Sequence, residues 1–341
     1  MIFNWWKDIS GGNDPKVAPD KVTISEFTVK SALFGLSVGD AIGVPFEFKS
    51  RQLMKLFPAS DMSGYGTYNL PAGTFSDDSS LSFCLAESLV NGFNPDDMAQ
   101  KFINWRYYNY WSARGNVFDV GSSTDKAIDK LAKGVGVNKS GGTKPDSNGN
   151  GSLMRILPLV FIFGNEPIKE RFRMTKQVSS ITHAHELSVL SCFYYLEFAR
   201  AIIAGKEKFE VYEMMKTLFS KNRKMLGLKN KCESFDRLTK GDIFLLTEDD
   251  IKSSGYVIDT LEASIWCFLT TQSYAQAVLK AVNLGDDTDT TATVTGGLAG
   301  LYYGYGGIPE NWVEQLAMRQ EIESLAKRLV AKMGGGLFRE N

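Results

Sequence analysis

Apolar residues recur at helical spacing along most of the chain. Ile258, Leu261, Ile265 and Leu269 lie three or four positions apart, which places them on one face of a helix. No stretch alternates strictly between apolar and polar residues, as a half-buried strand would, and no unit of about 20 to 50 residues is repeated. The pattern predicts an all-α fold with a single helical domain over residues 23–335.

Local capping signals predict where several of these helices begin. A capping box joins a Ser or Thr at the N-cap to a Glu or Gln three residues later, and Pro favours the first helical position. The signals are Thr23-x-x-Glu26, Asn94-Pro95, Ser273-x-x-Gln276 and Pro309, the last of which would open a final helix that buries Trp312 and Leu316.

Three polar stretches precede or interrupt the helical pattern. Residues 1–22 hold Gly and Pro amid mixed charge and predict a flexible N-terminal arm. Trp5 and Trp6 in this arm either pack back on the body of the protein or contact another protein. Residues 136–152 are rich in Gly, Ser and Asn and predict a loop. Residues 220–255 predict a polar insertion, whose basic run is typical of a solvated face.

The bulk composition limits the partners and the compartment. The chain has 341 residues, of which 43% are apolar, and a net charge of −1, so it lacks the basic excess of a nucleic-acid-binding domain. Its four cysteines are far apart, which fits reduced thiols in the cytoplasm rather than a disulfide frame or a zinc site. The most apolar stretch, 31–48, contains Asp40, Pro45 and Glu47, and residues 1–10 lack a signal-peptide core. We therefore expect a cytoplasmic protein with no nucleic-acid or membrane partner.

Four Asp-Asp pairs carry the candidate chemistry. Asp96–Asp97 and Asp249–Asp250 have ordinary local explanations, the first in a predicted first helical turn and the second in the polar insertion. Asp77–Asp78 and Asp286–Asp287 instead lie in clusters of hydroxyl and carboxyl groups that run directly into apolar segments. Capping explains either cluster alone, but a cap needs only one acceptor.

The two clusters together predict a metal site if they face each other. Two carboxylates about 4 Å apart repel by about 4 kcal/mol at an effective dielectric constant of about 20, and a divalent cation reverses the sign of that energy. Oxygen ligands without thiol or imidazole select Mg²⁺, Mn²⁺ or Ca²⁺. An EF-hand is excluded, because Ala292 and Leu298 stand at the positions, counted from Asp287, where Gly and Glu are required.

Six short motifs follow one another along the chain. They are "GLSVGDAIGVPFEF" (35–48), "GTFSDDSSL" (73–81), "FDVGSST" (118–124), "SNGNGSLMRILPL" (147–159), "THAH" (182–185) and "NLGDDTDTTATVTGGLAGLYYG" (283–304). In this order they resemble the motifs of the ADP-ribosylglycohydrolases, the helical enzymes that remove ADP-ribose from proteins. Each motif alone is a modest signal, whereas six in the family order, over most of the chain, are specific.

The resemblance implies a central two-metal site with two Mg²⁺ per subunit, or Mn²⁺ in their place. Asp119 would lie beside the metals and position or deprotonate the attacking water, and Glu47 would touch the metal site or the ribose. The turn at 149–154 would hold the diphosphate through backbone N–H groups. The implied metal ligands are Ser76, Asp77, Asp78, Asp287, Asp289 and Thr290, and the implied substrate-binding residues are Gly121, Ser122, Asn150, Gly151, Ser152, Met154 and His183.

The implied reaction is hydrolysis at C1″ of the distal ribose of an ADP-ribosylated protein, with ADP-ribose as product. The motif at 118–124 is similar to that of members acting on ADP-ribosyl-arginine, so an N-glycosidic arginine linkage is expected. Three alternatives stay open: an immunity-type protein that also blocks an ADP-ribosylating toxin through residues 1–22, a phosphodiesterase acting on free nucleotides, and a non-catalytic homologue.

Some residues have simpler local explanations or depart from the family pattern. Asp286 stands where the family has glycine, so its added charge would either face water or alter the metal site. Taken alone, Asp119 is more typical of a helix cap and His183 of a structural histidine. Asp40 is expected to cap or brace its own helix. The spacing of four between Gly35, Gly39 and Gly43 predicts close contact with another helix.

Overall fold

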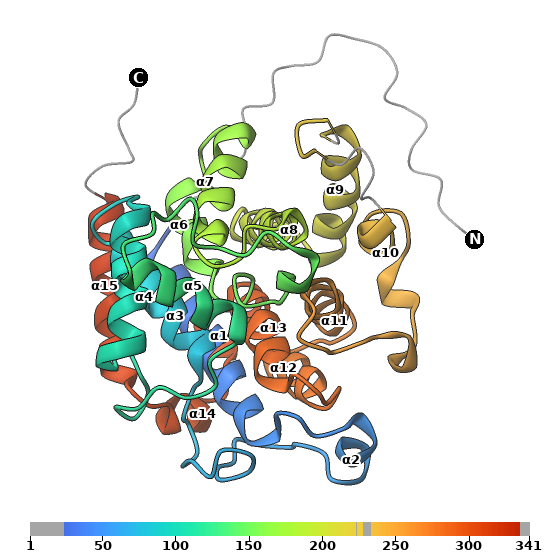
Figure 1. Cartoon of the computed structure of the whole chain (residues 1–341). Coiled ribbons are helices and arrows are strands. Elements are labelled where there is room, and N and C mark those ends of the chain that lie inside the picture. Colours follow the sequence, from blue (N-terminus) through green and yellow to red (C-terminus); the bar gives the residue numbers. More distant parts are fainter. Residues whose placement is uncertain (1–23, 223, 228–232, 335–341) are drawn as a thin grey trace, which may run out of the picture.

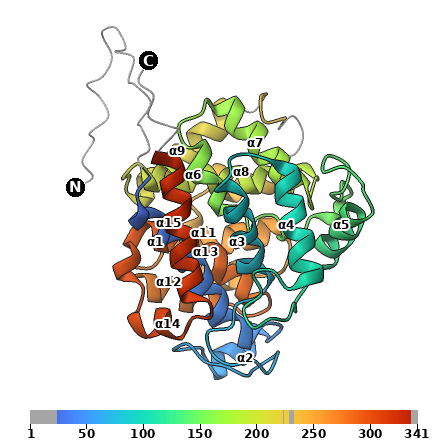
Figure 2. The ribbon, with the colours of Figure 1, turned by 90° about the vertical axis from the view of Figure 1, so that its left-hand side faces the viewer.

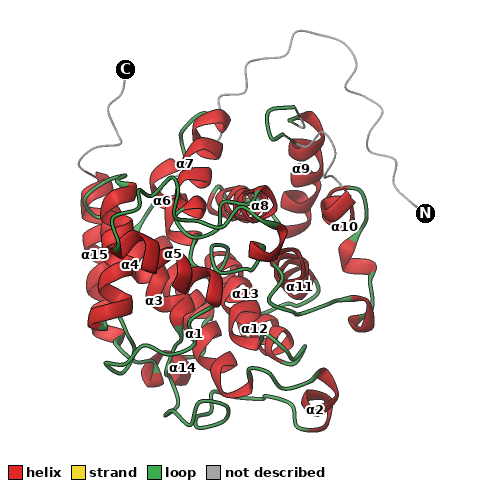
Figure 3. Ribbon diagram, viewed as in Figure 1, coloured by secondary structure: helices red, strands yellow, loops and turns green. Residues whose placement is uncertain are grey.

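The computed structural model describes residues 24–222, 224–227 and 233–334, and within these ranges the regular structure is helical apart from isolated β-bridges (Figure 3). This confirms the all-α prediction. The proposed arm at 1–22 lies outside the described residues. The α-helices are α1 (Glu26–Gly43), α2 (Arg51–Leu56), α3 (Asp77–Leu89), α4 (Pro95–Tyr108), α5 (Ser122–Ala132), α6 (Val160–Phe163), α7 (Ile168–Ser180), α8 (Glu186–Ile203), α9 (Lys208–Lys221), α10 (Asp236–Thr239), α11 (Val257–Leu269), α12 (Tyr274–Val282), α13 (Thr288–Tyr303), α14 (Glu310–Gln315) and α15 (Arg319–Gly334).

Short 3₁₀ turns join several of these helices. They are η1 (Val44–Phe46), η2 (Pro145–Ser147), η3 (Leu157–Leu159), η4 (Glu233–Phe235), η5 (Ile243–Leu245), η6 (Glu248–Asp250) and η7 (Tyr305–Gly307).

Two helices far apart in sequence, α1 and α13, pack together at the centre of the molecule (Figure 1). Glycines make this close approach possible. A Cβ atom on Gly39 would lie 2.2 Å from the carbonyl oxygen of Ala292, and one on Gly35 would lie 2.5 Å from that of Gly296. Real Cβ atoms do not approach backbone atoms this closely, so no side chain fits at either position. The predicted glycine contact is confirmed.

The same contact brings the start of α13 to the end of α1. A Cβ atom on Gly43, the last residue of α1, would lie 2.3 Å from the Cα of Asp289 in the first turn of α13. Thr288 donates a hydrogen bond of 2.8 Å to the carbonyl oxygen of Gly43, which fixes the register of the two helices. Glu47, which follows η1, is thereby placed beside the acidic start of α13.

A buried carboxyl group in α1 holds the start of α3 against the same centre. Asp40 accepts hydrogen bonds from the backbone N–H groups of Ser76 and Ser79, both 2.9 Å, and from the Ser79 hydroxyl at 2.6 Å. Asp40 thus caps α3 rather than its own helix, which corrects the expectation. Burial raises the pKa of Asp40 to about 6, although the bonds from Ser79 and Ser76 oppose this shift. In Figure 2, α15 covers the outer side of α1 and α3.

The helix starts agree with the predictions at α4 and differ at α1 and α12. Asn94 accepts from the backbone N–H groups of Asp96 and Asp97, as expected of an N-cap. Helix α1 has Ser25 as its N-cap, in a capping box with Thr28, instead of the predicted box at 23–26. Ser273 caps α12, but the side chain of Gln276 accepts from the N–H of Gln272, so the predicted reciprocal bond is replaced.

The C-terminal helical segment is two helices rather than the single one predicted. Pro309 is the N-cap of α14, and Trp312 and Leu316 are buried as expected. The C-cap of α14 is Leu316, whose ψ of 130° is extended, and Met318, whose φ of 55° is left-handed, precedes α15. Neither conformation continues a right-handed helix, which explains the interruption.

The two predicted polar interruptions have different structures. Residues 136–152 form an irregular loop, as predicted, with η2 and isolated β-bridges at Gly142 and Gly149. The described part of 220–255 instead carries short helical turns, and Phe235, Leu238 and Ile243 are fully buried. This part of the insertion therefore contributes to the core. Arg223, Lys229 and Lys231 of the basic run lie outside the described residues, so its solvated face stays a prediction.

A long apolar helix near the start of the described residues belongs to the core. Residues Glu26–Phe46 are long and apolar enough to cross a membrane, but 83% of their most apolar window is buried inside the fold. The described cysteines, Cys84, Cys192 and Cys267, are buried and free.

Candidate active site

A cavity of about 440 Å³ opens where the N-terminal ends of α3, α5 and α13 meet the turn at 149–154. Of the residues predicted for the site, twelve line this cavity: Glu47, Asp77, Asp78, Asp119, Gly121, Ser122, Asn150, Gly151, Met154, His183, Asp287 and Thr290. Ser76, Ser152 and Asp289 do not line it. The cavity is also lined by Phe48, Val120, Ser123, Thr124, Asp146, Gly149 and Gly255, which the motifs did not single out as site residues.

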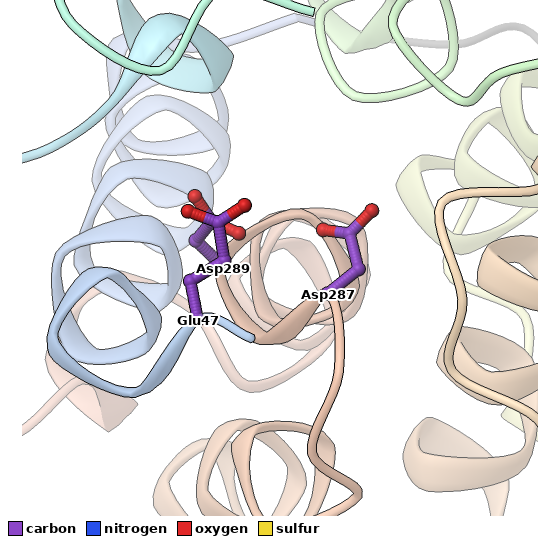
Figure 4. A group of neighbouring side chains, drawn as sticks. All are labelled: Glu47, Asp287 and Asp289. Carbon is purple, nitrogen blue, oxygen red and sulfur yellow. The ribbon is translucent and has the colours of Figure 1, made fainter. Parts of the chain in front are cut away.

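Both acidic clusters contribute to this cavity, Asp77 and Asp78 at the start of α3 and Asp287 at the start of α13, and Asp289 lies next to its lining. Oxygen atoms of Glu47, Asp287 and Asp289 lie within 4.8 Å of one another, close enough to hold a metal ion together. Figure 4 shows the three carboxyl groups projecting to the same side of the ribbon. The hydroxyl group of Thr290 donates to Asp78 at 3.3 Å, which links the start of α13 to the start of α3. The two clusters therefore face one site, as the sequence predicts.

The acidic groups of the site destabilise one another's charged forms. Burial, followed by the neighbouring carboxylates, raises the pKa values of Asp77, Asp78 and Asp289 well above their usual range. Burial, followed by the charge of Asp119, raises the pKa of Glu47 to about 9. A positive charge at the centre would favour the ionised forms and lower all four pKa values.

Two oxygens in the cluster have no partner of their own. Asp78 Oδ2 and Asp289 Oδ2 are buried and accept no hydrogen bond from the described residues. The other oxygen of Asp289, Oδ1, accepts from the N–H of Thr290 at 2.9 Å. A buried acceptor left unsatisfied costs about 1–3 kcal/mol, and more when the group is charged. A hard cation such as Mg²⁺ would bind these carboxylate oxygens and satisfy them.

Asp287 is held from the opposite wall of the cavity. The side-chain amide of Asn150 donates to Asp287 Oδ2 and to the Thr260 hydroxyl, both at 2.8 Å. The backbone N–H of Asn150 also donates to the carbonyl oxygen of Gly255 at 3.1 Å, so the glycine-rich turn is fastened to the loop before α11. Burial raises the pKa of Asp287, and the hydrogen bond from Asn150 opposes that shift.

Glu47 and Asp119 both line the cavity. Tyr68 donates a hydrogen bond of 2.6 Å to Glu47 Oε2, and its ring packs on Phe118, with the ring centres 4.9 Å apart. Asp119 has a left-handed φ of 53° and precedes Gly121, the residue at the N-cap of α5, so it does not act as a helix cap. Sequence reasoning missed Tyr68, because no motif contains it.

Two expected site residues have side chains that serve other contacts. Ser76 is the N-cap of α3, and its hydroxyl oxygen accepts from the N–H of Asp78 at 3.3 Å. The Ser152 hydroxyl lies in the core, where it accepts from Ser179 at 2.9 Å and lies 3.4 Å from Cys192 Sγ. Ser152 thus does not present its side chain to the cavity.

The side chain of Asp286 faces solvent, so of the two possibilities given by the sequence its charge points to water. Its side chain is exposed and its φ is 60°. Its backbone makes two hydrogen bonds, donating to the carbonyl of Lys49 at 2.8 Å and accepting from the N–H of Phe48 at 2.7 Å. Left-handed φ values favour Gly and are tolerated by Asp, so the backbone conformation explains why either residue fits here.

Comparison with known proteins agrees with this geometry. Residues 25–336 match the family model described as ADP-ribosylglycohydrolase. The chain is 32% identical over 317 residues to ADP-ribosylarginine hydrolase Tri1 of Serratia proteamaculans (strain 568), covering 92% of this chain and 81% of that protein. It is 27% identical over 300 residues to ADP-ribosyl-[dinitrogen reductase] glycohydrolase of Rhodospirillum rubrum, and the match covers 86% of this chain and 91% of that protein.

A solved structure shares the fold. A chain of an "ADP-ribosylglycohydrolase-related protein complex" superposes with a TM-score of 0.75 at 29% identity, over 90% of this chain and 98% of that chain. The helical architecture agrees with these matches. This chain therefore belongs to the ADP-ribosylglycohydrolase family.

Proposed function

We propose that this protein hydrolyses the N-glycosidic bond between ADP-ribose and an arginine side chain of a modified protein. The observation that carries the proposal is the meeting of the acidic starts of α3 and α13 at one cavity, beside the turn at 149–154. The arginine linkage is supported by the similarity to relatives named ADP-ribosylarginine hydrolase.

The residues of the cavity fit hard divalent cations, and we infer that two Mg²⁺ bind, with Mn²⁺ as the alternative. The unpartnered oxygens of Asp78 and Asp289 and the raised pKa values of the buried acids support a bound positive charge. When bound, such cations supply positive charge that polarises ribose hydroxyl groups and water. The residues that would hold them are Asp77, Asp78, Asp287, Asp289 and Thr290, with the Glu47 carboxyl group close enough to share a cation with Asp287 and Asp289. Ser76 would be a further ligand, although its oxygen already accepts at the cap of α3.

The chain's own groups would divide the remaining work. The backbone N–H groups of the turn at 149–154 would bind the diphosphate. Asp119 would orient the attacking water and accept its proton. As the C1″–N bond breaks, the water oxygen bonds to C1″, and the proton returns to the leaving guanidine nitrogen. Glu47, held by Tyr68, would position the ribose. The transition state would be oxocarbenium-like.

Product analysis tests this proposal. Arginine-ADP-ribosylated protein is incubated with Mg²⁺ and either the wild type or Asp77→Asn. We expect the wild type to release ADP-ribose and the variant to release it about 100-fold more slowly, because a ligand is lost. AMP as the product would indicate a phosphodiesterase instead, and undiminished release by the variant would contradict the proposed site.

The suggestion that residues 1–22 bind an ADP-ribosylating toxin stays a prediction, as does a cytoplasmic location. Deleting 1–22 from an Asp77→Asn variant separates binding from catalysis. If the arm blocks the toxin, the inactive full-length variant protects against it and the truncated variant does not.

A further inference from the structure

His183 presents one edge of its ring to the cavity and the other to the core. A Cβ atom on Gly151 would lie 2.8 Å from the Cε1 atom of His183 and 3.4 Å from its Nε2, and one on Gly149 would lie 3.6 Å from Nε2. The Nε2 edge therefore packs against the glycine-rich turn that lines the cavity. The Nδ1 atom lies 2.9 Å from the Thr182 hydroxyl oxygen, which is fully buried.

The Thr182 hydroxyl is in turn paired with a buried arginine. Arg155 Nη2 donates to Thr182 Oγ1 at 2.7 Å. A guanidinium group has donors only, so the hydroxyl must accept in this bond and its own proton remains to be placed. Among the hydrogen bonds of the described residues, His183 Nδ1 is the other partner of this hydroxyl, at 2.9 Å, so it is the group placed to accept that proton. If Nδ1 carried a proton instead, both Arg155 and His183 would donate to the Thr182 hydroxyl oxygen, and the hydroxyl proton of Thr182 would have no acceptor.

Arg155 is fixed where it can play this role. Its side chain is fully buried, with Nη2 also 3.4 Å from the carbonyl oxygen of Val178 and the guanidinium 4.8 Å from the centre of the Phe102 ring. Burial, followed by the charge of Arg155, lowers the pKa of His183 to about 3. The imidazole is therefore neutral at neutral pH, and its single proton must lie on one of the two nitrogens.

We propose that Arg155 and Thr182 are positioning residues that hold His183 in its Nε2–H tautomer, so that this N–H donates to an oxygen of bound ADP-ribose. The inference rests on the proposed function for the identity of the ligand, whereas the tautomer is a property of the free protein. Arg155 donates to the Thr182 hydroxyl, and this hydroxyl donates to Nδ1 of His183. The proton of His183 is then on Nε2, which lies beside the glycine-rich turn.

Nitrogen NMR of protein labelled with ¹⁵N-histidine reads the tautomer directly. The chain has two histidines, so His185→Gln assigns the resonances of His183. We expect a protonated, pyrrole-like Nε2 and an unprotonated, pyridine-like Nδ1 in the free wild type. Thr182→Val removes the hydroxyl at nearly constant shape and should mix the tautomers, whereas Thr182→Ser keeps the hydroxyl and should restore the single form.

Ligand binding supplies the second readout. Thr182→Val should weaken ADP-ribose binding about fivefold if the Nε2–H form falls to about a fifth of the population, because only that form donates to the ligand. Thr182→Ser should restore the affinity. ADP, which lacks the distal ribose, identifies the acceptor: an equal loss assigns the bond to the diphosphate, and an unchanged affinity assigns it to the ribose.

A protonated Nδ1 in the wild type would overturn the proposal, as would a Thr182→Val protein with the wild-type tautomer and affinity. If that variant fails to fold, the wild-type spectrum still decides the tautomer. A wild type that binds no ADP-ribose would refute the proposed ligand while leaving the tautomer to be read from the free protein.

Discussion

At the residue scale, single side chains set the geometry of the acidic site. Tyr68 donates to Glu47 at 2.6 Å, and Asp286 keeps its charge in solvent because a left-handed backbone turns it outward. The local sequence pattern indicates neither the hydrogen bond from Tyr68 nor the outward direction of Asp286. A separate prediction follows from each of these two features.

Removing the Tyr68 hydroxyl should slow the reaction without unfolding the protein. Tyr68→Phe removes the hydrogen bond that orients Glu47, and a bond to a charged or strongly polarised group is worth about 1.5–3 kcal/mol. We expect kcat/KM to fall about tenfold or more. Tyr65→Phe, at a tyrosine that is 64% exposed, is the matched control and should leave kcat/KM unchanged. Equal rates for both variants would contradict the role given to Tyr68.

The left-handed backbone at Asp286 should decide which residues that position accepts. Asp286→Gly should keep full activity and a free energy of unfolding within about 1 kcal/mol of wild type, since glycine adopts this φ readily. Asp286→Val should lower the free energy of unfolding by about 1–3 kcal/mol, because a β-branched residue is strained there. Chemical denaturation checks both values, and a valine variant as stable as wild type would contradict the backbone explanation.

At the element scale, the contact between α1 and α13 places the two acidic clusters together. Gly35, Gly39 and Gly43 let the helices approach, and Asp40 then draws the start of α3 to the same point. The acidic cavity is thus a consequence of helix packing rather than of any one loop.

A methyl group at this contact should be costly. Gly39→Ala would place its Cβ 2.2 Å from a backbone oxygen, so the helices must separate. We expect the free energy of unfolding to fall by about 3 kcal/mol or more, which is the upper end of the destabilisation that overpacking usually causes. Gly306→Ala, where a Cβ meets nothing within 4 Å, should stay within about 1 kcal/mol of wild type. Similar losses for both variants would argue against the close contact.

How far the sequence predicts this site depends on the range of each interaction. Helix spacing, the glycine contact and the acidic clusters follow from residues a few positions apart, and each of these predictions is confirmed. Tyr68 and Thr260 reach the site through hydrogen bonds between distant segments, which no local pattern encodes. Ser152 shows the remaining limit, because a glycine-rich motif does not indicate the direction of a neighbouring side chain.

At the scale of the whole molecule, the buried acids link stability to pH and metal. The pKa of Glu47 is raised to about 9, and those of Asp77, Asp78 and Asp289 are raised well above the usual range. The folded, metal-free protein therefore binds more protons than the unfolded chain. Its free energy of unfolding must therefore fall as the pH rises from the pKa of these acids in the unfolded chain towards their higher pKa in the folded protein.

This linkage predicts the effect of metal removal. In EDTA, Tm should fall by about 2 °C or more between about pH 5 and about pH 9, and the gain in Tm on adding Mg²⁺ should grow over the same range. Scanning calorimetry at several pH values provides the measurement. A Tm in EDTA that stays level or rises with pH would contradict the assigned pKa shifts.

The most direct test of the central claim is calorimetric titration of the metal-free protein with Mg²⁺. If both acidic clusters hold the cations, the wild type binds two Mg²⁺ per chain, and Asp78→Asn in α3 and Asp289→Asn in α13 each weaken binding about tenfold or more. Absence of Mg²⁺ binding by the wild type, or wild-type affinity in either variant, would show that the clusters do not form one cation site.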